Sequence, residues 1–282
     1  MANYTAKDIK ALRDKTGAGM MDVKNALAEA EGDATRAEEL LRLKGLKSAA
    51  KREGRTASAG LVLSDVSEAN GAMTGVLVEV NSETDFVAKN DSFIAFSNEL
   101  LEAAVASGAS TVEELNAAPL GDATVADRVA AMIGVIGEKI VVGKVARVNG
   151  EHVESYMHFT SPDLPPQVGV LIATDKAGAE VAHDVAVHIA ALSPRYLDET
   201  EVPEELVENE RRIATELTLA EGKPEKAVPM IVEGRLKGFY KQICLVDQAY
   251  ARDPKVSVGQ VLKDAGAKVT SFARIRVGAS EE

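Results

Sequence analysis

The chain has 282 residues, of which 46% are apolar, enough for buried cores in one large or two ordinary domains. Its formal net charge of -12 disfavours a nucleic-acid-binding protein, because neutralisation of phosphates by Lys and Arg supplies most of that affinity. Cys244 is the only cysteine, which excludes an intramolecular disulfide and a cysteine metal cage and fits a reducing compartment. We expect a globular protein that binds a protein or a small molecule.

The amino terminus gives no sign of export. Residues 1–5 lack the basic and then apolar pattern of a signal peptide. Nowhere does a run approach the roughly 18 apolar residues of a membrane span. We therefore expect a cytoplasmic protein without membrane contact.

Residues 5–45 have the pattern of three short helices separated by glycines. Thr5 and Asp8 resemble a capping box, and the first helix is expected to end before the segment Thr16-Gly17-Ala18-Gly19. A second helix is predicted over residues 20–30, because apolar side chains recur near one face. These side chains are Met21, Ala26, Leu27 and Ala30.

A third helix is expected to be capped by Asp33 and to stop at Gly45. A basic stretch follows among small residues, and it is either a flexible linker or, the more ordinary reading, a solvated helical connector. The basic residues are Lys44, Lys47, Lys51, Arg52 and Arg55. We assign residues 1–55 to a three-helix module with its basic linker.

From residue 59 the pattern changes to that of strands. Residues 60–63 and 75–80 are strand-like, and the turn signal over residues 68–71 between them predicts a hairpin. Residues 91–106 then have the apolar pattern of a helix, and residues 140–145 that of a further strand. This is an α+β module, which we assign to residues 56–149.

The module is repeated in the second half of the chain. Residues 75–78 are echoed by residues 169–172, and a helix is predicted over about 180–192. Both copies close with a strand rich in basic residues, at 142–148 and 269–277. We expect two related β-α-β subdomains, the second spanning residues 150–282.

A charged stretch from about 203 to 243 interrupts the second copy. Two arms with apolar residues close to heptad spacing flank the turn Gly222-Lys223-Pro224, which predicts an antiparallel coiled-coil hairpin. Pro229 makes an irregular start of the second arm the expected geometry. The apolar positions are Leu206, Ile213, Leu217 and Ala220, then Val228, Val232, Leu236, Phe239 and Ile243.

Motifs for nucleotide and metal chemistry are incomplete. The segment from Gly137 to Gly143-Lys144 has one residue too many for a phosphate-binding loop and lacks its hydroxyl residue. Residues 17–22 begin a dinucleotide fingerprint but lack its third glycine. Metal-ligand spacing is absent among the four histidines, His152, His158, His183 and His188. We expect no cofactor, no metal and no enzymatic activity.

Residues 81–90 form a polar segment with one aromatic residue, Phe86, between a strand and a helix. In one reading, Asp85 or Asn90 caps the helix and Phe86 belongs to the core. In the other, Phe86 lies at the rim of the sheet and anchors a partner, as large aromatics do at interface hot spots. The residues by themselves leave both open.

Five short segments, in this order, resemble the signatures of the bacterial elongation factor Ts family, and together they span nearly the whole chain. They are residues 16–22 (TGAGMMD), 83–90 (ETDFVAKN), 136–138 (IGE), 221–224 (EGKP) and 232–236 (VEGRL). Residues 245–250 depart from the family, with LVDQAY where LLEQPF is frequent. The resemblance implies a UBA-like amino-terminal module, and a guanine-nucleotide exchange factor for the GTPase elongation factor Tu.

In that family the segment that matches Thr84, Asp85, Phe86 and Val87 enters the GTP-binding domain of the partner. Its aromatic residue displaces groups that hold Mg²⁺, which weakens GDP. By the same resemblance, further partner contacts are expected at Met20, Met21, Ile136 and His158. The expected partner is elongation factor Tu in its GDP-bound and nucleotide-free states, without direct contact to nucleic acid.

Two other functions stay open on the residues alone. An adaptor would tether partners without effect on nucleotide. An enzyme with an unrecognised site would turn over GTP or bind a ligand by itself. Release of GDP from the partner discriminates the exchange factor from both.

Overall fold

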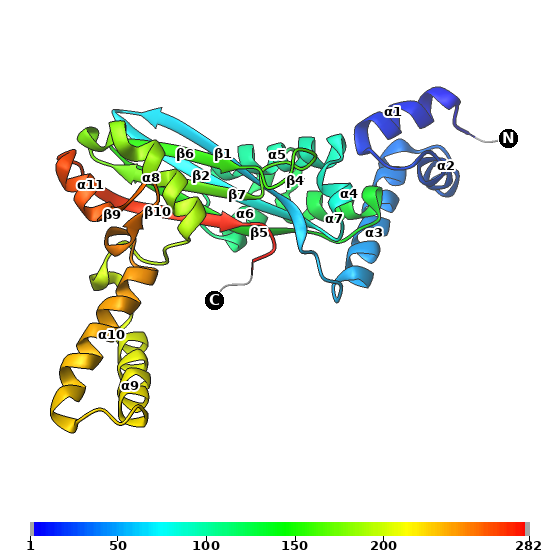
Figure 1. Ribbon diagram of the computed structural model, residues 1–282. Helices are drawn as coiled ribbons and strands as arrows, with labels where there is room; N and C mark the ends of the chain where they lie inside the picture. Colours follow the sequence, from blue (N-terminus) through cyan, green and yellow to red (C-terminus); the bar gives the residue numbers. More distant parts are fainter. Residues whose placement is uncertain (1–2, 280–282) are drawn as a thin grey trace.

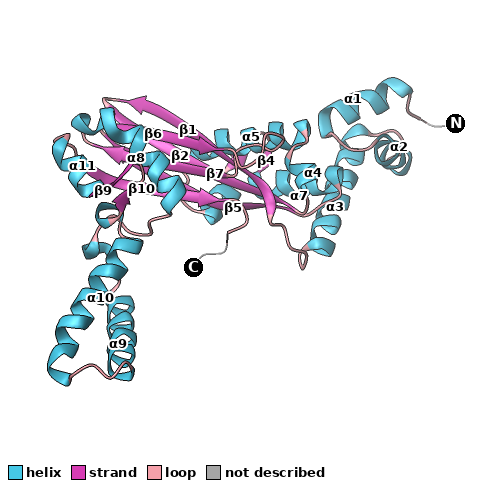
Figure 2. Ribbon diagram, viewed as in Figure 1, coloured by secondary structure: helices cyan, strands magenta, loops and turns pink. Residues whose placement is uncertain are grey.

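The computed structural model describes residues 3–279 and combines helices with antiparallel sheets, which confirms the mixed α+β class (Figures 1 and 2). Three helices form one end of an elongated molecule, and stacked sheets covered by helices form its middle. A pair of long helices projects from the other end (Figure 1). Within residues 3–279, none of the helices has the length and apolar character needed to cross a membrane.

The amino-terminal end consists of α1 (Ala6–Thr16), α2 (Met20–Glu29) and α3 (Ala34–Arg52). The predicted capping box of Thr5 and Asp8 is present, and the Asp33 carboxylate accepts a hydrogen bond from the backbone of α3. The three helices share a small core in which Leu12, Val23, Ala26, Leu27, Ala30 and Ala37 are buried.

The expected end of the third helix at Gly45 is wrong, because α3 continues to Arg52. A Cβ at Gly45 would lie 3.1 Å from the carbonyl oxygen of Ala130, and one at Gly134 would lie 3.2 Å from Cα of Gly45. The glycines let α3 cross α7 (Val125–Ile136) at short distance. Gly45 therefore serves helix packing, and the basic stretch through Arg52 is the helical connector.

We expect Gly45→Val to lower the free energy of unfolding by about 1–3 kcal/mol, because the added side chain overlaps the backbone of α7. Urea denaturation followed by circular dichroism measures the change. Gly238→Val is the matched control, since a Cβ at Gly238 meets nothing within 4 Å. Equal stability of the two variants would contradict the packing role of Gly45.

The first sheet has the antiparallel strand order β1-β2-β5, with β1 (Ala59–Ala69), β2 (Ala72–Ser82) and β5 (Ile140–Gly150). Asn70 and Gly71 have positive φ angles of 55° and 77°, the conformation that a tight hairpin turn requires, so the predicted hairpin is confirmed.

Helices cover the outer face of this first sheet. The predicted helix is α5 (Asp91–Ser107), and its Phe93, Phe96 and Leu100 are buried against the sheet. The sequence patterns did not predict α6 (Val112–Ala117), α7, or the two-stranded ribbon of β3 (Pro119–Leu120) and β4 (Ala123–Thr124).

The second sheet has the antiparallel order β6-β7-β10, with β6 (His152–His158), β7 (Val168–Thr174) and β10 (Val269–Arg276). After β7 come a 3-10 turn η1 (Lys176–Gly178) and helix α8 (Ala179–Leu192), which packs on the outer face of the sheet. In each half the strand before the main helix pairs antiparallel with the strand after it, β2 with β5 and β7 with β10. A further antiparallel strand, β1 or β6, precedes each of these pairs. The division of the chain near residues 55 and 149 stays a prediction.

The inner faces of the two sheets pack against each other. Gly75 and Gly169 allow this approach, because a Cβ at Gly75 would lie 2.8 Å from Leu171 and Val153, and one at Gly169 would lie 2.7 Å from Val62. The shared core buries Val62, Leu77, Val148, Val153, Leu171, Ala173 and Ile275. The molecule is therefore layered helix, sheet, sheet, helix in its middle.

The projecting pair consists of α9 (Glu204–Ala220) and α10 (Val228–Ile243), joined through a 3-10 turn η3 (Glu225–Ala227) (Figure 1). The predicted contact face of α9 is wrong by one position, because Ala214 and Thr218 are buried whereas Leu217 is 50% exposed. Small residues of α9 receive the larger Val228, Val232 and Leu236 of α10. A heptad pattern assigned from large apolar residues does not detect a contact face that consists of small residues.

Short elements complete the described chain. They are the 3-10 turns η2 (Glu199–Glu201) and η4 (Leu245–Asp247), the ribbon of β8 (Ala249–Tyr250) and β9 (Asp253–Ser257), and α11 (Val258–Asp264).

Candidate partner-binding site

The segment singled out in the sequence forms a single helical turn, α4 (Asp85–Ala88), between β2 and α5. Thr84 caps this turn, since its Oγ1 accepts a hydrogen bond of 3.4 Å from the backbone N–H of Val87. Asn90 caps α5 by accepting a 2.9 Å hydrogen bond from Ser92 N–H. Of the two residues expected to cap α5, Asn90 forms the cap, and Asp85 is exposed to solvent.

Phe86 does not belong to the core, because 74% of its surface is exposed. Ala88 is buried, and Val87 packs half-buried against the first core. One helical turn therefore divides its residues, with Asp85 and Phe86 outward and the next two inward. The ammonium of Lys89 lies 5.1 Å from the ring centroid of Phe86, a contact that leaves most of the ring in solvent.

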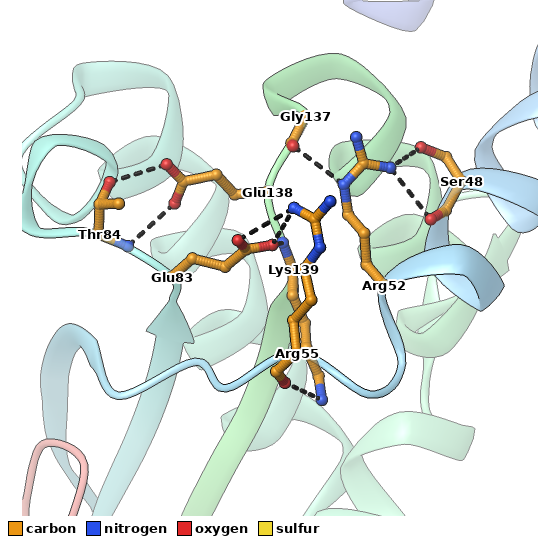
Figure 3. A network of polar contacts seen from close by, with 8 residues as sticks. All are labelled: Ser48, Arg52, Arg55, Glu83, Thr84, Gly137, Glu138 and Lys139. Carbon is orange, nitrogen blue, oxygen red and sulfur yellow. Dashed lines mark hydrogen bonds and ion pairs between the residues drawn. The ribbon is translucent and has the colours of Figure 1, made fainter.

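A crossed pair of carboxylates holds the 84–87 turn (Figure 3). Glu138 accepts hydrogen bonds from Thr84 N–H at 3.0 Å and from Thr84 Oγ1 at 2.8 Å. Glu83 accepts a hydrogen bond of 2.6 Å from the backbone N–H of Lys139. Each carboxylate thus binds the backbone next to the other one, and the end of β2 is joined to the start of β5.

The same network reaches the end of α3 (Figure 3). Arg55 donates to Glu83 at 3.2 Å, and Lys139 Nζ donates to the carbonyl oxygens of Glu53 at 2.5 Å and Arg55 at 2.8 Å. Arg52 donates to the carbonyl oxygen of Gly137 at 2.9 Å. The pKa of Glu83 lies below its ordinary value, first because of the Lys139 N–H and then because of Arg55.

Met20 and Met21 begin α2, with 58% and 62% of their surfaces exposed. The expectation that Met21 belongs to the packed apolar face of this helix is wrong, because Val23 fills that core instead. At the end of α1, a Cβ at Gly17 would lie 3.9 Å from Val135 of α7. The loop between α1 and α2, which precedes the two methionines, therefore approaches the end of α7.

Ile136 is the last residue of α7 and lies half-buried against the first core. Gly137 ends the helix with a positive φ of 84°, and Glu138 follows it directly. Ile136 is therefore the chain neighbour of Gly137, whose carbonyl oxygen binds Arg52, and it lies two residues before Glu138, which binds Thr84.

His158 lies exposed at the end of β6, in the second sheet, and makes none of the hydrogen bonds described above for Glu83 and Glu138. Its Nδ1 is 3.2 Å from the hydroxyl of Tyr156, and the adjacent Phe159 is 59% exposed. Sequence reasoning missed Phe159, as well as the roles of Glu83 and Glu138. The two glutamates stood inside recognised motifs, but their partners are more than fifty residues away.

Groups suited to chemistry are either buried or scattered. Across residues 3–279 no three His, Cys, Asp or Glu side chains are arranged to hold a metal ion. Burial raises the pKa of the Cys244 thiol to about 12. His188 is buried, with its Nε2 2.8 Å from Gln248 Oε1 and its Nδ1 3.1 Å from the Ala251 N–H.

Burial lowers the pKa of His188 below its ordinary value near 6.5. The unfolded chain then binds the proton more readily than the folded chain, so the free energy of unfolding should fall as the pH drops below about 6.5. Urea denaturation between pH 7.5 and pH 5.5 measures this slope. His188→Gln should have a shallower slope than the native chain, and equal slopes would contradict a buried neutral imidazole.

Comparison with known proteins gives one consistent family. The family model described as elongation factor TS matches residues 83–279, more than half of the chain. Curated proteins named elongation factor Ts from Beutenbergia cavernae, Kocuria rhizophila and Micrococcus luteus are 57%, 58% and 59% identical to it. Each alignment covers 99% of this chain and all of the relative. The chain therefore belongs to the elongation factor Ts family, which acts in translation elongation.

Proposed function

We propose that this protein is a guanine-nucleotide exchange factor for elongation factor Tu and that Phe86 is the side chain that enters the partner. The observation that carries the proposal is the 74% exposure of an aromatic residue on a turn fixed by two carboxylates. An exposed aromatic side chain on a braced support has the properties of an interface anchor. The TDFV segment (Thr84, Asp85, Phe86 and Val87) is intact in this chain.

Exchange of this kind needs contact energy and no catalytic group of its own. A factor that binds nucleotide-free elongation factor Tu more tightly than the GDP form must weaken GDP by the same coupling factor. Insertion of Phe86 near the bound Mg²⁺ would displace groups that hold the ion. Asp85, exposed beside Phe86, would face the same region of the partner. The protein is accordingly proposed to be a non-enzyme without cofactor, working in the cytoplasm.

Further contacts are proposed at three other places on the molecule. Met20 and Met21 offer an exposed apolar pair on α2, and Ile136 lies close to the 84–87 turn. His158, at the exposed end of β6, would meet a different part of the partner. Separated contacts of this kind hold an exchange factor in one orientation and let Phe86 act at a defined place.

The proposal is tested by the release of a fluorescent GDP analogue from elongation factor Tu in a stopped-flow experiment. Addition of this protein, with excess unlabelled GDP, should accelerate release in a concentration-dependent way that saturates. An unchanged release rate despite binding would identify an adaptor and reject the proposal. Intrinsic GTP turnover by the isolated chain would instead identify an enzyme.

A further inference from the structure

The two carboxylates behind the 84–87 turn form a reciprocal arrangement (Figure 3). Glu83 precedes Thr84 and binds Lys139 N–H, while Glu138 precedes Lys139 and binds Thr84 N–H. Hydrogen bonds to an ionised carboxylate are stronger than hydrogen bonds between neutral groups. The relative position of the two chain segments is therefore fixed by at least two bonds that point in opposite directions.

The turn that carries Phe86 needs such support. Four residues make up α4, far fewer than the roughly 12 that an isolated helix requires for stability in water. Its cap is a hydroxyl, Thr84 Oγ1, that donates to Glu138 and accepts from Val87 N–H. Because the hydroxyl of Thr84 donates its hydrogen bond to Glu138, the lone pairs of the hydroxyl oxygen are left to face α4. Glu138 thus controls the cap as well as the backbone.

The arrangement also includes the connector from the amino-terminal helices. Arg55 binds Glu83, and Lys139 binds the carbonyl oxygens of Glu53 and Arg55 after the end of α3. Met20 and Met21 belong to the helices at the other end of that connector. The two surfaces proposed to contact the same partner are consequently joined through Glu83.

We propose that Glu83 and Glu138 are positioning residues, which hold Phe86 in the orientation that enters elongation factor Tu. This inference rests on the proposed exchange function. Without the carboxylates the aromatic side chain is still present and exposed, but the turn samples other orientations, and only a fraction of encounters displaces nucleotide. The effect is on the rate of release more than on the strength of binding.

The kinetic test is a double-mutant cycle between Glu138 and Phe86. Glu138→Ala should lower the maximal GDP-release rate roughly tenfold, with a much smaller change in the half-saturating concentration. In the Phe86→Ala background the same substitution should change the rate by less than about twofold, because nothing is left to position. Glu102→Ala, an exposed carboxylate on α5, is the matched control and should leave the rate unchanged. Glu138→Gln should restore part of the loss.

A second readout needs no partner. The chain contains no tryptophan, so Phe86→Trp introduces a single tryptophan at the turn, whose fluorescence can be excited selectively over that of the five tyrosines. Adding Glu138→Ala to this variant should lower the fluorescence anisotropy of Trp in the free protein, whereas adding Glu102→Ala should not. Circular dichroism melting confirms that each variant is folded, and Glu138→Gln replaces Glu138→Ala in both tests if the latter unfolds.

The outcomes separate this inference from the function on which it rests. Lower anisotropy together with a non-additive cycle supports the positioning role. An equal loss from Glu138→Ala in the presence and absence of Phe86, or an unchanged anisotropy, overturns it even where the native chain accelerates GDP release. If the native chain does not accelerate release, the proposed function fails and the positioning role falls with it, whatever the anisotropy shows about the turn.

Discussion

Phe86→Ala is expected to slow the release of GDP from elongation factor Tu by roughly 30- to 1,000-fold relative to the native chain, which corresponds to about 2–4 kcal/mol for loss of a central aromatic anchor. The side chain is 74% exposed, so its truncation opens no cavity. The free energy of unfolding should therefore change by less than about 0.5 kcal/mol. Stopped-flow release and urea denaturation, on the same preparations, measure the two quantities.

Leu192→Ala is the control for Phe86→Ala, because Leu192 is also a large exposed apolar residue and lies at the end of α8. It should leave the release rate unchanged. A Phe86 variant that unfolds early would show that the ring stabilises the fold. A folded Phe86 variant with native release rates would show that the anchor lies elsewhere.

Phe93→Ala should lower the stability and leave the exchange rate almost unchanged, although Phe93 lies in α5, the helix that follows Phe86. Its ring is fully buried between α5 and the first sheet, in the cluster with Val78 and Leu100. Truncation leaves a cavity, and the expected loss is about 3–5 kcal/mol in the free energy of unfolding. Urea denaturation followed by circular dichroism measures it.

Exchange activity per folded molecule should survive this loss. At a temperature where Phe93→Ala is folded, its maximal GDP-release rate should lie within about twofold of the native rate, since the Glu83 and Glu138 hydrogen bonds that hold the 84–87 turn do not involve Phe93. A folded Phe93 variant with the rate of Phe86→Ala would contradict the separation of core and anchor. The variants Phe86→Ala and Phe93→Ala therefore distinguish an aromatic residue that stabilises the fold from one that contacts the partner.

Local signals predicted much of the secondary structure. The Thr5 and Asp8 capping box, the Asp33 cap and the Asn70-Gly71 turn are each confirmed, because each involves groups within three residues of one another. The predictions of secondary structure and helix contacts were wrong where one residue type serves two structural roles. Gly45 ends no helix, since it permits the crossing of α3 and α7, and the contact face of α9 is built from the small Ala214 and Thr218.

By itself, the sequence determined the α+β class, the places of α1, α2, α5, α8 and the hairpin of β1 and β2, and the family to which the motifs belong, but not α7. The sequence did not decide whether Phe86 lies in the core or at the rim of the sheet, because the same local pattern of residues is compatible with both positions. Only the tertiary structure decided that the ring faces solvent and that Glu83 and Glu138 hold the turn. The bonds concerned join residues 54 and 56 positions apart, and such contacts exist only once the chain has folded.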